Sequence, residues 1–159
     1  AWLNGADIRG SYNWSSALAS TAKASFLFAK DVTRNDWLIQ MPANRLSFNT
    51  AYTHDISNRL QECFLSADAR YVFRQNRIPA NFDAIDYPRP PGGYFLLDIA
   101  TGTKLVAGRQ PLYISLTVMN IFNQRYRDYL DAFRYFIDQP GTNIVLRLRV
   151  PFSFNEHQQ

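Results

Sequence analysis

Apolar and polar residues alternate along seven stretches of this chain. The clearest is QECFLSADARYVFRQ, residues 61–75, in which odd positions from Cys63 to Phe73 are apolar or small and most even positions are polar or charged. Successive side chains of a strand point to opposite faces, so this period of two predicts β-strands with one apolar face. The other six stretches are residues 2–14, 20–30, 45–54, 94–103, 112–120 and 143–152.

The connections between these stretches alternate in length. Short connections lie near 15–19, 55–59 and 106–111, and longer ones span roughly 31–44, 76–93 and 127–142. This alternation favours an antiparallel up-and-down meander, as in a β-barrel with one elaborated end, over a Greek-key sandwich. In residues 126–137, YRDYLDAFRYFI, apolar and aromatic side chains recur at helical spacing. This pattern predicts either a short helix or a packed helical turn inside a loop.

Periodicity alone does not say which face of the sheet meets water. The apolar faces carry almost no charge over about nine to eleven residues, the length of a membrane-spanning β-strand. The chain is 15% aromatic, with 12 Phe, 9 Tyr and 3 Trp, which suits the aromatic girdles of a membrane barrel. These features favour a lipid-facing apolar side. A soluble β-barrel or sandwich that binds a small apolar ligand or a sugar is the alternative.

Charge and reactive residues point to no further chemistry. The net charge of +4 comes from bases scattered among acids, so we expect no nucleic-acid partner. The single cysteine, Cys63, cannot form an intramolecular disulfide, and no metal-ligand spacing is visible. The two histidines, His54 and His157, lack an evident nucleophile or carboxylate pair. We therefore expect no enzyme, no cofactor and no metal site.

Five motifs occur in an order that resembles the C-terminal part of TonB-dependent outer-membrane receptors. They are NGADIRGSYNW, QMPANRLSFNTAY, PPGGYFLLDIATG, LTVMNIFNQRYRDYL and QPGTNIVLRLRVPF. The chain departs from the family pattern at Thr142, where Arg is usual, and in the SFNEHQQ extension after Phe152. The final aromatic of the family resembles a signal for the barrel-assembly machinery, and Phe152 or Phe154 would supply it here.

The resemblance implies that residues 1–159 form the last third of a large transmembrane barrel in the bacterial outer membrane. The plug domain and earlier strands would lie outside this segment. The long loops would be extracellular and the short turns periplasmic. The strand YISLTVMN would turn its odd-numbered residues to the lumen, and Phe122 and Tyr126 would join the outer aromatic girdle.

The implied function is energy-coupled uptake of a ligand such as a ferric siderophore, haem, cobalamin or glycan. The implied partners are outer-membrane lipid, the TonB complex through the absent N-terminal part, the plug domain and a surface lipoprotein. Candidate ligand contacts in the loops are Trp37, Gln40, Arg77, Tyr87, Arg89, Arg127, Tyr129, Phe133, Arg134 and Tyr135. Their alternative role is packing within the loops. Lumen charges expected to pair with each other or with the plug are Asp68, Arg70, Arg147 and Arg149.

Overall fold

A computed structural model describes residues 1–80, 89–107 and 110–151. Within these ranges the chain forms seven long strands and one short strand, and all seven predicted strands are confirmed. The strands are β1 (Trp2–Asn13), β2 (Leu18–Asp31), β3 (Asp36–Trp37), β4 (Arg45–His54), β5 (Leu60–Val72), β6 (Tyr94–Ala107), β7 (Gln110–Met119) and β8 (Asn143–Arg149). In the same ranges, no helix is long and apolar enough to cross a membrane.

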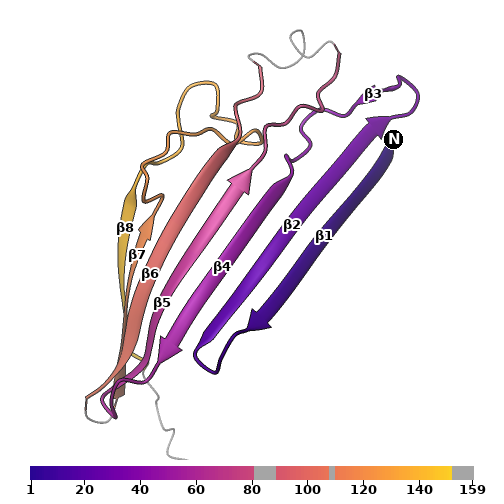
Figure 1. Cartoon of the computed structure of the whole chain (residues 1–159). Coiled ribbons are helices and arrows are strands. Elements are labelled where there is room, and N and C mark those ends of the chain that lie inside the picture. Colours follow the sequence, from indigo (N-terminus) through magenta and orange to yellow (C-terminus); the bar gives the residue numbers. More distant parts are fainter. Residues whose placement is uncertain (81–88, 108–109, 152–159) are drawn as a thin grey trace, which may run out of the picture.

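The strands form one antiparallel sheet in the order β1-β2-β4-β5-β6-β7-β8, so every long strand pairs with its neighbours along the chain (Figure 1). The long connections 32–44, 73–93 and 120–142 leave from one end of the sheet, as the alternation of lengths predicted. The two-residue β3 pairs with the end of β2 and was not predicted, because two residues are too short to show a period. Residues 126–137 contain a single helical turn, closed by Ile137 N–H donating to Phe133 O.

The cross-strand register brings most of the large apolar side chains of the strands to one side. One row across the sheet reads Ile8, Ala24, Leu46, Tyr71 and Phe95. We call this side the apolar face; it comprises the even positions of β1, β2, β4, β7 and β8 and the odd positions of β6 and of β5 from residue 63 onward. The opposite side, the polar face, carries the charged and small polar residues predicted for it.

The long loops fold over the polar face. Val72, Tyr94 and Leu96 all lie on that face near the loop end, and they are 6–8% exposed. Loop residue Ala43 completes this small buried cluster, and Tyr126 packs against it. At the loop end of the sheet, residues of the long loops therefore pack against the polar face and bury part of it.

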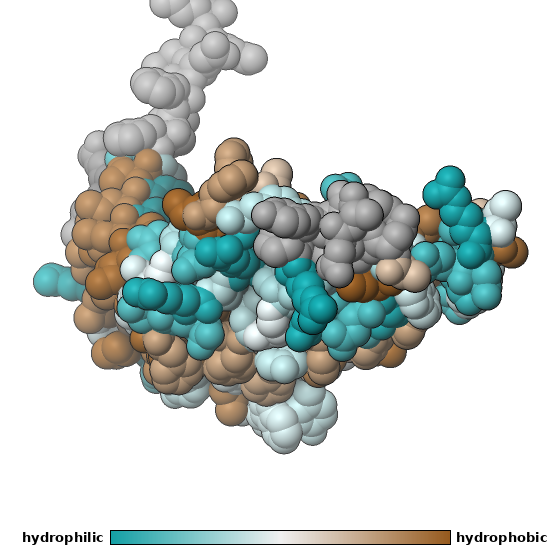
Figure 2. All heavy atoms as spheres, turned by 90° about the horizontal axis from the view of Figure 1, so that it is seen from above, coloured by the Kyte–Doolittle hydropathy of each residue, from teal (hydrophilic) through white to brown (hydrophobic). Residues whose placement is uncertain are grey.

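The apolar face has no such cover within the described residues. Its exposed large side chains are Trp2, Ile8, Tyr12, Phe28, Leu46, Phe48, Tyr52, Leu65, Tyr71, Phe95, Ile99, Leu116, Ile144, Leu146 and Leu148. Figure 2 shows hydrophobic residues gathered along one margin of the sheet viewed from the loop end, with hydrophilic residues over the inner surface. An apolar surface this extensive is unusual on a soluble monomer.

Aromatic rings mark both ends of the apolar face. At the loop end, Phe73 packs edge-on against Tyr71 at 4.8 Å, and Phe122 lies 6.3 Å from Phe95. At the end with short turns, Tyr12 packs edge-on against Trp14 at 4.8 Å. The position of Phe122 agrees with its predicted place in a girdle.

Tyr126 was wrongly predicted as a girdle residue. Its ring centroid lies 4.4 Å from that of Tyr94, whose side chain is on the polar face. The loop after β7 turns over the polar face, so this tyrosine lies there and not at the end of the apolar face. Periodicity could not show this, because the alternation of faces ends at Met119.

A β-bulge shapes the short-turn end of β5. The register with β6 shifts between Gln61 and Phe64, and Glu62 adopts a positive φ of 49°. The bulge lets Phe64 lie across Gly102 on β6. A Cβ at that glycine would stand 2.7 Å from the Phe64 ring and 2.6 Å from Ile114 O. Glycine is therefore required there by the close approach of β5 and β7.

We predict that Gly102→Ala destabilises the protein by about 1–3 kcal/mol, because the added methyl group forces Phe64 and the β7 backbone to move. Gly10→Ala is the matched control: a Cβ at Gly10 meets nothing within 4 Å. It should be neutral or stabilise the strand by about 0.5–1 kcal/mol. Thermal unfolding of both variants in detergent measures the difference. Equal effects at the two glycines would contradict the packing described here.

Candidate functional site

The candidate site is the polar face together with the loops that cover its outer end. β2 is longer than β4, and its last register pair with β4 is Ser25 with Arg45. Beyond this pair, the free edge of β2 is completed by side chains. Arg77 donates to Leu27 O at 3.1 Å and to Asn44 Oδ1 at 2.7 Å. This arginine thus joins the loop after β5 to β2 and to the loop before β4.

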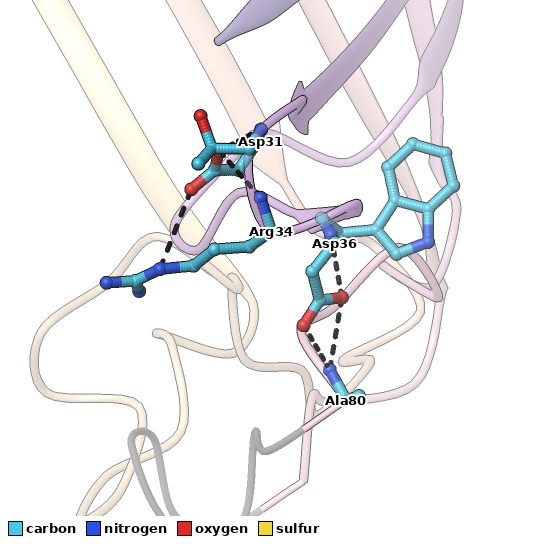
Figure 3. Close-up of polar contacts among 6 residues, drawn as sticks. Asp31, Arg34, Asp36 and Ala80 are labelled. Atoms are coloured by element: carbon cyan, nitrogen blue, oxygen red, sulfur yellow. Dashed lines mark hydrogen bonds and ion pairs between the residues drawn. The ribbon is translucent and has the colours of Figure 1, made fainter.

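A carboxylate makes a second link between the same two loops. Asp36, on β3, accepts a hydrogen bond from Ala80 N at 2.9 Å, and its side chain points toward that residue (Figure 3). The preceding turn is closed by Asp31, which accepts hydrogen bonds from the backbone N–H groups of Thr33 and Arg34. The loop after β2 and the loop after β5 are therefore joined at the loop end of the sheet.

Two asparagines of the motif NIFN order the connection from β7 to β8. Asn120 and Asn123 both adopt left-handed backbone conformations, with φ of 50°. Asn120 is 5% exposed and donates from its side chain to Gln124 O at 2.9 Å. Its backbone N–H donates to Asp98 on β6 at 2.7 Å, and Thr142 N–H donates to Asn123 Oδ1 at 3.1 Å. The motif thus links the end of β7 to β6 and to the start of β8.

Two arginines hold the body of this third loop. Arg134 is 6% exposed, and its guanidinium lies 4.6 Å from the ring centroids of both Tyr129 and Tyr135. It also donates to Tyr129 O. Arg127 forms an ion pair with Asp138 and donates to Arg134 O at 2.9 Å. Ring contacts and hydrogen bonds therefore engage Arg134, and an ion pair and hydrogen bonds engage Arg127.

A tyrosine pair joins the third loop to the sheet. Tyr94 donates its hydroxyl to Asp128 Oδ2 at 2.8 Å, and its ring packs on Tyr126. Burial raises the pKa of Tyr126 above its ordinary value, although Arg70 opposes the shift. The phenol therefore stays neutral at physiological pH and acts as a packing group.

The predicted loop contacts fall into two groups. Those engaged in the fold are Arg77, Arg127, Tyr129, Arg134, Tyr135 and Trp37, whose backbone pairs with β2. Gln40, Arg89 and Phe133 are exposed. Tyr87 and the assembly-signal residue Phe152 lie outside the described residues. A role as direct ligand contacts remains a prediction for the residues of both groups.

All four charges predicted for the lumen lie on the polar face. Asp68 and Arg70 form a pair with N···O of 3.5 Å. Arg149 stacks over Tyr113 at 4.4 Å. Arg147 and Arg149 line a hollow of about 430 Å³ at the short-turn end, together with the ion pair of Lys104 and Glu62.

A second hollow on the polar face was not predicted as a site. It has a volume of about 420 Å³, and Arg9, Lys23, Arg45 and Arg70 line it from four strands. The sequence shows each residue on the polar side of its strand but not the register that brings them together. No group of three or more His, Cys, Asp or Glu in the described part of the chain could hold a metal ion.

The comparisons with known proteins support the fold. No protein-family model matches the chain, and no curated protein matches it. Among solved structures, the chain is similar to the copper transporter OprC, with a TM-score of 0.75 and 17% sequence identity. The match covers 92% of this chain and 22% of that transporter. The fold is therefore an all-β antiparallel sheet that matches one segment of a larger transport protein.

We predict that Arg134→Gln loosens the loop between β7 and β8, because two tyrosine rings and a backbone carbonyl lose a charged partner. The local loss of about 1–3 kcal/mol corresponds to an acceleration of amide hydrogen exchange by roughly 5- to 150-fold in residues 126–139. Arg125→Gln is the control, since Arg125 is an exposed arginine of the same loop. Unchanged exchange in the Arg134 variant would show that this side chain does not hold the loop and is available for a ligand.

Proposed function

We propose that this chain is a wall segment of a bacterial outer-membrane β-barrel that takes up a ligand in a TonB-dependent manner. The observation that carries the proposal is the unequal cover of the two faces. In the described residues, the long loops bury the loop end of the polar face, whereas all seven long strands expose large apolar side chains on the apolar face. The hydrocarbon of a lipid bilayer suits such a face, and this supports a membrane location.

Two further features support a membrane wall. Aromatic pairs mark both ends of the apolar face, as expected where strands pass the two membrane interfaces. The long loops share one end of the sheet, which suits an extracellular surface facing short periplasmic turns. The outer edges of β1 and β8 lack a partner strand in the described residues, so each suits pairing with a further barrel strand.

The structural likeness supports transport as the activity. The similar solved structure is a transporter, and this chain corresponds to about a fifth of its length. Together with the ordered sequence motifs, this supports a barrel whose other strands, plug domain and contact with the TonB complex lie outside the segment. The candidate cargoes are a ferric siderophore, haem, cobalamin or a glycan, and the name of the neighbour adds copper to these.

We predict that a side chain on the apolar face meets lipid, whereas its neighbour on the polar face does not. Phe48 and Asn49 are adjacent on β4 and point to opposite faces. Each is replaced by cysteine in a Cys63→Ser background and labelled with a nitroxide. In the full-length polypeptide reconstituted into liposomes, the label at residue 48 should be relaxed strongly by oxygen and weakly by a water-soluble nickel chelate.

The label at residue 49 is the matched control and should show less oxygen contact. A soluble domain would give a different result, because its apolar face would be covered by protein and a label at residue 48 would reach neither reagent. Recovery of the polypeptide in buffer without detergent, together with that labelling result, would overturn the proposed membrane location and favour the soluble β-barrel or sandwich.

A further inference from the structure

Positive charge is concentrated in one row of the polar face. The register places Arg9 of β1 directly opposite Lys23 of β2. The same row continues through Ser47 of β4 to Arg70 of β5. Like charges directly opposite each other destabilise a sheet, so the row requires a compensating negative charge.

The next row toward the loops completes the site. It contains Asp7, Ser25 and Arg45 on β1, β2 and β4. The hollow of about 420 Å³ is lined by residues of both rows. Ser47 lies between Lys23 and Arg70 in the first row, and Ser25 lies between Asp7 and Arg45 in the second. Hydroxyl and guanidinium donors in this arrangement suit an acceptor with several oxygens.

Protein carboxylates balance this charge only in part. Asp7 is the single acidic residue among those that line the hollow, against four bases. Arg70 has a partner in Asp68 at 3.5 Å. Arg9, Lys23 and Arg45 take part in no ion pair within residues 1–80, 89–107 and 110–151. The hollow therefore presents a net positive charge to whatever passes along the polar face.

We infer that this hollow binds an oxyanion, namely a carboxylate or phosphate group of the transported solute. The inference deepens the proposed function, because it assigns a negative charge to the cargo and places a contact on the barrel wall and not in the loops. Arginine holds carboxylate and phosphate groups through paired N–H donors, and lysine adds a point charge. An anion in the hollow would also relieve the repulsion between Arg9 and Lys23.

The test uses the full-length polypeptide in detergent and two probes, inorganic phosphate and tricarballylate, at matched ionic strength in chloride. Calorimetric titration should show binding of at least one probe, and the probe that binds more tightly identifies the phosphate or the carboxylate class. Lys23→Gln and Arg9→Gln should each weaken binding about tenfold. Arg34→Gln is the control: it makes the same change of charge in a loop, where the Arg34 side chain is 83% exposed.

A second measurement separates an open site from one that the protein itself fills. In the absence of either probe, Lys23→Gln should raise the unfolding temperature, because it removes a like charge opposite Arg9. A lower unfolding temperature would mean that an acidic segment of the full-length polypeptide already neutralises the row, and it would overturn the inference. Absence of binding by both probes would overturn it as well.

The inference and the proposed function fail in different ways. If residue 48 meets lipid and neither probe binds, only the anion site is wrong. If a probe binds and the charge variants weaken it, but residue 48 does not meet lipid, the site stands and the proposed membrane transporter is wrong.

Discussion

Cross-strand register is the constraint on which the rest of this structure depends. Side chains alternate with a period of two, so a slip of one residue between any two strands would move charged groups to the apolar face. Lys23 or Arg147, placed on a lipid-facing surface at mid-membrane depth, would cost about 2–4 kcal/mol. The register found here keeps Lys23, Arg147 and the other mid-strand charges on the polar face, and Lys30, near the end of β2, is the exception. Slips by an odd number of residues are therefore disfavoured.

At the strand ends, side chains form the hydrogen bonds to backbone groups that a neighbouring strand no longer provides. Where β2 extends past β4, Asn44 and Arg77 bond the backbone of Leu27. Where β7 ends, Asn120 turns the chain with a positive φ and bonds both the loop and β6. These contacts satisfy backbone groups that would otherwise lie at a free sheet edge under the loops. They also hold the loops at one end of the sheet.

The sequence was sufficient for the strands and insufficient for the loops, for a physical reason. Strand positions follow from local alternation, so the seven long strands and their apolar sides were predictable from patterns such as residues 61–75. Loop geometry depends on contacts between distant residues, such as Asp36 with Ala80 and Tyr94 with Asp128. Tyr126 was misplaced because no periodic signal extends beyond Met119. The cationic hollow was missed because each base is ordinary within its own strand, and only the register joins them.

The contacts that hold the loops together also change where binding of an anion is expected. Loop arginines were natural candidates for contact with an anionic cargo, but Arg77, Arg127 and Arg134 already hold the loops together. Four other bases, Arg9, Lys23, Arg45 and Arg147, form no ion pair in the described residues and lie on the polar face. A charge there costs little while water fills the space beside the sheet, and it interacts more strongly with a solute that displaces this water. The polar face, and not the loops, is therefore where these four bases are placed to interact with an anion.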